Sequence, residues 1–487
     1  MRRGYTVAGL WLSLSVLAAA CSGGDGNGQA GTEGADSDDA AATGLPPPVP
    51  GEVVAQLRRP ARNLRWDGRH LYATGIPYTF IRIDRATGEA VELPFGRAFG
   101  DTADGAFATN TVVDGEVAMV VNETGPGDDR LVVPDLDTGD LRAVDIPFDE
   151  FLTFPPSVDE VGVVIGFTTG DVALVTGGAG SIGDFVTVPG VTTLTAPVRH
   201  GTSVWLAAPD DSAVVELNAA DLSLRRRIDV APLPNVLAVH DDTLWVGHAA
   251  GPSLTGVDLE TGSILQEIDL MPDDPRATPT EVEPVLATVD DRLFARVGYS
   301  WDGQPVAVIA EIDTDTGAVS ARRTVAAGIA SLGAVDGELL VLDSAGRIVS
   351  VDLERFTGDD DSSAPMPSPF TFRPTGTEQA AIDAFSTVYD PGGDPEAVVA
   401  GIEGDLGSTA IVEDAFAALA DAGIASFEPV AAAVDGDRAW VSFNALDFSG
   451  RRIVTDDTAA LLLVDGDWKV PKAQVCMDLS VVGVECP

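Results

Sequence analysis

Residues 239–265 read VHDDTLWVGHAAGPSLTGVDLETGSIL, and this stretch contains both patterns that decide the fold. The first pattern, from Val239, is a polar turn followed by a short apolar strand. The second, from Gly256, is an apolar strand that ends in Asp, then a turn and another strand. In that turn Gly can adopt a positive φ, and the Asp side chain can accept hydrogen bonds from backbone amides. Together the patterns predict consecutive antiparallel strands.

Both patterns recur between about residues 60 and 360. The seven copies of the first begin at Trp66, Val113, Val158, Arg199, Val239, Val289 and Val335. The second begins at Ile81, Val133, Val215, Gly256 and Glu311, and the third unit has the glycine-rich residues 177–183 instead. The spacing of roughly 40 to 50 residues is that of a four-stranded propeller blade. We therefore expect a mainly β chain with a seven-bladed β-propeller over residues 51–356.

The seventh unit supplies only three strands, near residues 329–334, 338–343 and 347–354, before an acidic linker at 357–374. A spare β-like stretch, EVVAQL, lies at the other end of the propeller within Gly51–Arg59. We expect this stretch to complete the last blade, because an unpaired strand edge invites association with other chains.

The Asp-x-x-Thr-Gly turns resemble the repeats of quinoprotein-like and YVTN-type propellers over about 300 residues. This resemblance implies a fold rather than an activity. Quinoprotein dehydrogenases typically carry a Trp a few residues after the Thr-Gly, and residues 89–93 and 263–266 contain none. The departure argues against a quinone, and we expect no cofactor.

From residue 375 the periodicity changes to that of an α+β domain extending to residue 487. Helices are expected at 377–389, with Thr377 as N-cap, and at 394–402 and 409–419. Strands are expected at 425–434, 438–446, 459–464 and 468–475.

Helices followed by a curved antiparallel sheet, a DWKV strand and a cysteine resemble the NTF2-like cone domains over about 110 residues. The small secreted mycobacterial antigens of low molecular weight are the most similar type. Catalytic members of that superfamily keep an Asp/His pair in the cone, and no His follows His248 here. The resemblance therefore implies a module that is not catalytic.

The N-terminus has the three parts of a secretory signal: Arg2 and Arg3, an apolar run over residues 7–17, and small residues before Cys21. It resembles a bacterial lipoprotein signal, although Ala18 stands where the lipobox usually has Leu. The resemblance implies lipidation of Cys21 and attachment to the outer side of the cell membrane. The alternative is an ordinary signal-peptidase cut near Ala20.

Residues 22–50 consist largely of Gly, Ala, Asp, Ser and Pro, which predicts a disordered tether. The formal net charge of −47 argues against nucleic acid as a partner. This charge is typical of a solvated acidic surface, and a surface that attracts cations is the alternative interpretation. Arg greatly outnumbers Lys, which is typical of an actinobacterial genome of high GC content.

Cys476 and Cys486 form an even pair in an oxidising compartment and predict a disulfide. A metal site or catalytic thiol is the alternative, but the four histidines, His70, His200, His240 and His248, are remote in sequence. His240 and His248 are eight residues apart around a strand, and we expect ordinary structural histidines. The acidic turns at Asp135 and Asp313 lack the pattern of an EF-hand, so no metal site is expected.

Polar residues stand where the innermost strand of several units begins: Arg62, Asn63, Asn110, Thr153, Asn235 and Glu283. We expect them to gather around one mouth of the central channel and to bind a small ligand. The alternative is that they are turn residues bonded to their own backbone.

These features predict a cell-envelope lipoprotein that acts as a binding or scaffolding module without catalysis. Its partner would be an envelope protein, a glycan or a small molecule. The alternative is an extracytoplasmic propeller enzyme, a lyase or a quinone-type dehydrogenase.

Overall fold

The computed structural model describes the chain from residue 46 to residue 484 with internal gaps. The described residues are 46–95, 108–113, 116–121, 130–146, 157–158, 162–166, 170–176, 181–279, 285–302, 304–325, 329–357, 372–481 and 483–484.

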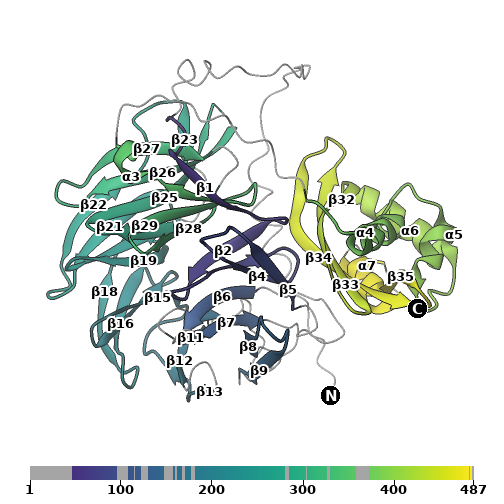
Figure 1. The fold of residues 1–487 in the computed structure, drawn as a ribbon, viewed down its shortest axis with the longest axis horizontal. Coiled ribbons are helices and arrows are strands. Elements are labelled where there is room, and N and C mark those ends of the chain that lie inside the picture. The colour runs from purple at the N-terminus through teal and green to yellow at the C-terminus, as the bar shows by residue number, and fades with distance from the viewer. Residues whose placement is uncertain are drawn as a thin grey trace. The chain divides into compact units, whose positions relative to one another are not determined.

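Seven antiparallel sheets follow one another in the described part of the chain from residue 51 to residue 351 (Figure 1). The first three sheets contain β2 (Ala61–Trp66), β3 (Leu71–Gly75), β4 (Thr79–Ile83) and β5 (Ala90–Pro94); β6 (Ala108–Val113), β7 (Glu116–Val121), β8 (Arg130–Pro134) and β9 (Leu141–Asp145); and β10 (Ser157–Val158), β11 (Val163–Gly166), β12 (Asp171–Thr176), β13 (Ser181–Ile182) and β14 (Val186–Thr187).

The next three sheets contain β15 (Thr195–His200), β16 (Ser203–Ala208), β17 (Ala213–Asn218) and β18 (Leu224–Asp229); β19 (Pro234–His240), β20 (Thr243–His248), β21 (Ser253–Asp258) and β22 (Ile264–Asp269); and β23 (Ala277–Pro279), β24 (Val285–Val289), β25 (Arg292–Trp301), β26 (Gln304–Asp313) and β27 (Ala318–Val325). The seventh contains β28 (Ile329–Val335), β29 (Glu338–Asp343), β30 (Arg347–Val351) and β1 (Gly51–Gln56), and the short α3 (Leu353–Phe356) follows. The chain therefore contains a β-propeller, as the repeat predicted.

The Asp-x-x-Thr-Gly turns form as their chemistry predicts. Oδ1 of Asp84 accepts hydrogen bonds from the amides of Ala86 and Thr87, both at 2.9 Å. The glycine of the same turn, Gly88, has a φ of 71°. A residue with a Cβ would be strained in this conformation, so glycine suits the position. The turn of Asp313 has the same arrangement.

The last blade is completed from the other end of the propeller. Strand β1 pairs antiparallel with β30, from Gly51 opposite Val351 to Gln56 opposite Arg347. Strand β28 at the other side of this sheet contacts β2 of the first blade. The predicted clasp is therefore confirmed, and it joins the first and last blades of the ring.

The C-terminal region is an α+β domain. Its elements are α4 (Gly376–Val388), α5 (Pro395–Ala400), β31 (Ile402–Glu403), α6 (Thr409–Asp421), β32 (Ile424–Asp435), β33 (Arg438–Asp447), β34 (Arg452–Val464), β35 (Asp467–Pro471) and α7 (Lys472–Val481). The sheet has the order β31-β35-β34-β33-β32, in which only β31 and β35 are parallel.

Several boundaries differ from the sequence predictions, and the strand expected at 459–464 begins already at Arg452. The N-cap of α4 is Thr375 rather than Thr377, because Glu378 closes a capping box with Thr375. The last strand ends at Pro471 rather than Val475, and α7 begins at Lys472. Proline has no N–H for a further ladder bond, so the strand ends there.

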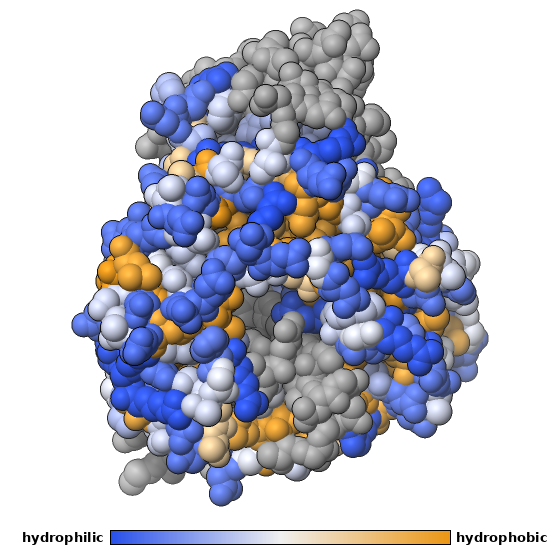
Figure 2. Space-filling view, turned by 60° about the vertical axis from the view of Figure 1, so that its left-hand side comes forward, coloured by the Kyte–Doolittle hydropathy of each residue, from blue (hydrophilic) through white to orange (hydrophobic). Residues whose placement is uncertain are grey.

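The hydrophilic character of the surface is that expected from the acidic composition of the chain. On the face shown in Figure 2, hydrophilic side chains predominate and apolar ones form small separate groups. Large exposed apolar side chains include Leu265 at 54% and Phe448 at 72% exposure. No helix of the described residues is both long and apolar enough to span a lipid bilayer.

Candidate functional site

Four of the residues predicted to lie at the channel mouth are described by the structure, and each lies near the start of a strand. Arg62 and Asn63 are in β2, Asn110 is in β6 and Asn235 is in β19, each within the first three residues of its strand. These strands contact the corresponding strands of neighbouring blades, as expected along a central channel. Thr153 and Glu283 lie outside the described residues, so the proposed ligand site at the mouth stays a prediction.

The two histidines of the fifth blade have structural environments. His248 is buried, with Nδ1 3.2 Å from the carbonyl oxygen of Pro232 and Nε2 2.8 Å from Oγ1 of Thr255. Burial lowers the pKa of His248 below its ordinary value, although the contact with the Pro232 carbonyl opposes this shift. The lowered pKa favours the neutral ring. His240 is also buried, 3.6 Å from the carboxylate of Asp241.

The carboxylates of the acidic turns accept hydrogen bonds from backbone amides, as in Asp135.

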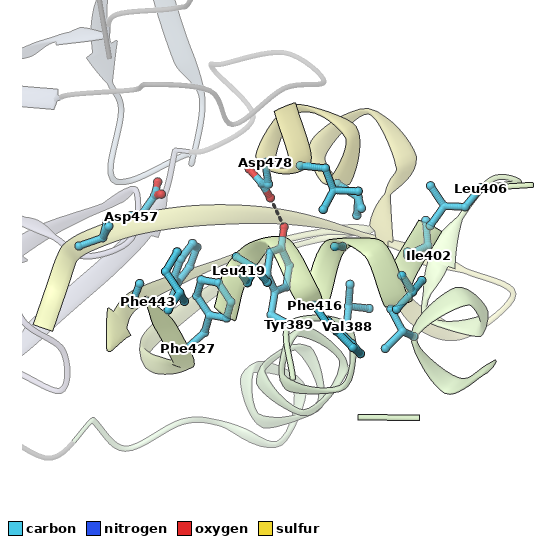
Figure 3. A pocket seen from close by; sticks show the side chains of 18 residues that line it. Val388, Tyr389, Ile402, Leu406, Phe416, Leu419, Phe427, Phe443, Asp457 and Asp478 are labelled. Carbon is cyan, nitrogen blue, oxygen red and sulfur yellow. Dashed lines mark hydrogen bonds between the residues drawn. The ribbon is translucent and has the colours of Figure 1, made fainter. Parts of the chain in front are cut away.

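A large apolar pocket lies within the C-terminal domain (Figure 3). Its volume is about 950 Å³, including the part open to solvent. Fifteen of the eighteen lining residues are apolar, and the complete set is Val388, Tyr389, Val398, Ile402, Leu406, Val412, Ala415, Phe416, Leu419, Ile424, Phe427, Phe443, Ala445, Val454, Asp457, Val475, Asp478 and Leu479. A lining of this composition is typical of small-molecule sites.

The helices and the sheet both contribute to the pocket. The stripe of apolar residues on α6 that includes Val412, Ala415 and Leu419 forms one wall. Phe427 of β32 and Phe443 of β33 come from the sheet. In Figure 3 these two rings lie toward one end of the pocket, whereas Ile402 and Leu406 lie toward the other. The pocket therefore has an aromatic end and an aliphatic end.

Tyr389 lies between these ends and belongs to an aromatic cluster. Its ring is stacked on Phe385, with the ring centroids 4.5 Å apart. Its centroid is 5.6 Å from that of Phe427 and 5.8 Å from that of Phe443. Such packing fixes the ring orientation, because aromatic pairs at these distances attract one another in defined geometries.

The pocket has three polar lining residues. The hydroxyl of Tyr389 donates a hydrogen bond to Oδ2 of Asp478, which also accepts one from Nε2 of Gln474 at Oδ1, at 3.0 Å. The third, Asp457, accepts the amide of Thr458 at 2.8 Å. Desolvation by the surrounding protein raises the pKa of Asp457 above its ordinary value, although the residue is exposed.

The sequence patterns did not reveal this pocket. The apolar stripe of α6 predicted a packing face, and nothing in the pattern shows that this face leaves a space between helix and sheet. Asp457 and Asp478 are two of many acidic residues in the chain. The sequence predicts Gln474 in a strand that ends at Val475 and predicts no helix over α7, so the pairing of Gln474 with Asp478 is not apparent from it.

Among the predicted cysteine sites, only Cys476 is described. It is on α7, partly buried against the core of the C-terminal domain. Cys21 and Cys486 lie outside the described residues, so lipidation and the disulfide stay predictions. Over the described ranges, no cluster of three or more His, Cys, Asp or Glu residues is arranged to hold a metal ion.

No protein-family model matches this sequence, and no curated protein matches it. Solved structures do. A streptogramin B lyase is 14% identical with a TM-score of 0.44, and the match covers 62% of this chain and 96% of the lyase. U3-55K is 9% identical with a TM-score of 0.48, over 63% of this chain and 100% of that chain. BamB from Moraxella catarrhalis is 12% identical with a TM-score of 0.42, over 59% and 83%. Likeness at this level concerns the propeller fold alone.

Proposed function

We propose that this chain is a cell-envelope lipoprotein, anchored through Cys21, that binds an apolar small molecule in its C-terminal pocket. The observation that carries the proposal is the pocket itself, with fifteen apolar residues among the eighteen that line it. Transfer of apolar ligand surface from water into such a pocket is favourable by about 25 cal/mol per Å². A binding role without catalysis is also the function that the sequence predicted.

The order of elements supports the finer classification of the C-terminal domain as NTF2-like. Three helices, α4 to α6, precede a sheet of long antiparallel strands, and the pocket lies between the helices and the sheet. The described lining residues include no His, Ser, Cys or Lys that would act as a nucleophile or base beside the carboxyls. This composition favours binding over catalysis.

Binding can be tested on the soluble form that starts at Gly51, with the neutral probe N-phenyl-1-naphthylamine, which fluoresces in apolar surroundings. Ala415→Trp should abolish the signal, because Ala415 is buried in the pocket wall. Ala417→Trp is the matched control, because Ala417 is exposed on the same helix. If Ala415→Trp impairs folding, Val454→Glu places a charge at a lining position that is 37% exposed. Unchanged probe binding in the folded variants would contradict the proposed site.

The anchor is tested separately in the native envelope. Cys21→Ser should release the protein into the medium or leave an unprocessed precursor, because the thiol is the only attachment point for the diacylglyceryl group. Unchanged membrane retention of Cys21→Ser would show that the lipoprotein assignment is wrong.

A further inference from the structure

We infer that the C-terminal pocket selects apolar ligands that are cationic or neutral and rejects apolar anions such as fatty acids. This inference rests on the proposed function, and it is carried by the charges of the lining residues. Among the described lining residues, the carboxyl groups are those of Asp457 and Asp478, and none of the eighteen is Lys, Arg or His.

An anionic head group would have no positively charged partner among these residues. Removing a carboxylate from water without a paired cation is costly, and two carboxyls in the lining add repulsion. The formal charge of −47 for the whole chain opposes an approaching anion in addition. The pocket therefore discriminates against fatty acids by charge, even though its aliphatic end suits their hydrocarbon chains.

Asp457 offers the place for a cationic group. In Figure 3 it lies at the aromatic end, beyond Phe443. Oδ1 of Asp457 accepts the hydrogen bond from the amide of Thr458, and Oδ2 accepts none from the residues that the structure describes. Desolvation raises the pKa of Asp457, and an ammonium group beside the carboxylate would favour its ionised form.

The neighbouring rings favour the same ligand class. The faces of Phe427 and Phe443 carry negative potential, which attracts an ammonium group placed over them. A hydrophobic amine with its nitrogen toward Asp457 would place its hydrocarbon part toward Ile402 and Leu406 (Figure 3). A neutral alcohol can bind in the same orientation through a hydrogen bond.

The test is displacement of bound N-phenyl-1-naphthylamine by dodecylamine, dodecanol and dodecanoate below their micelle concentrations. These compounds share the same chain length and differ in head-group charge. We expect the amine and the alcohol to displace the probe and dodecanoate to be at least about tenfold weaker. If dodecanoate displaces the probe as well as dodecylamine does, the selectivity is wrong while the proposed function stands. If the probe does not bind at all, the proposed function fails and the inference fails with it.

A variant pair tests the role of Asp457. Asp457→Asn should weaken dodecylamine binding about three- to tenfold and leave dodecanol unchanged, because only the charged head group loses a partner. Asp467→Asn is the control, since Asp467 is exposed at the start of β35 and carries the same charge. Equal losses in both variants would overturn a local role for Asp457 and indicate a long-range effect of net charge.

Discussion

Arg59 and Glu378 form a buried ion pair across 319 residues of sequence, with Nη2 2.8 Å from Oε1. Their side chains are only 2% and 5% exposed. Arg59 follows strand β1 and also donates to the carbonyl oxygen of Ala432 at 2.9 Å and to Glu92 of β5. Arg58 donates to the same two carboxylates. The segment that completes the last blade thus contacts the first blade and the C-terminal domain as well.

Glu378→Gln should lower the free energy of unfolding by about 2 kcal/mol, because it removes one of the two carboxylates that pair with the buried guanidinium of Arg59. Chemical denaturation measures this change. Glu413→Gln is the matched control, since Glu413 is exposed on α6. Equal stability of the two variants would show that the ion pair does not hold these parts of the fold together.

The effect of Glu378→Gln should depend on pH. Burial alone would raise the pKa of Glu378, but the hydrogen bonds from Arg58 and the Thr375 amide and the charge of Arg59 lower it below the ordinary value. A lowered pKa gives stability that is present above the unfolded pKa, about 4.3, and is lost as the pH falls through the folded value. The difference between wild type and Glu378→Gln should be constant from pH 7 to about 5 and shrink at lower pH. A difference that grows on acidification would contradict this assignment.

The features that could be predicted from the sequence are those with local causes. The turn of Asp84 and Gly88 needs only neighbouring residues, and its repetition predicted the blades. The clasp could be predicted because one blade lacked a strand and one spare strand remained. The Arg59–Glu378 pair and the pocket were missed because they depend on how distant elements pack, which no periodicity shows. The sequence predicts only a strand for the segment that contains Arg59, and nothing in the pattern indicates that the guanidinium group is buried.

Removal of the clasp strand should destabilise the propeller. Deletion of residues 51–56 removes the outer partner of β30 and exposes an unpaired edge, which favours unfolding and aggregation. A deletion of six residues from the predicted tether, 27–32, removes the same length of chain. We expect the first deletion to lower the melting temperature by several degrees and the second to leave it unchanged. Equal melting temperatures would rule out a stabilising role for β1.

The predicted disulfide between Cys476 and Cys486 should stabilise the C-terminal domain and its pocket. Nine residues separate the two cysteines, and closing such a loop is worth roughly 2 to 3 kcal/mol in the chain-entropy model. Cys476 is on α7, which also supplies Val475, Asp478 and Leu479 to the pocket. Reduction should therefore lower the unfolding temperature and weaken binding of N-phenyl-1-naphthylamine together. The variant in which both cysteines are Ser serves as control, because a reductant should not affect it. Mass spectrometry of the unreduced protein should find the two cysteine peptides linked, and two free thiols would show that the predicted bond does not form.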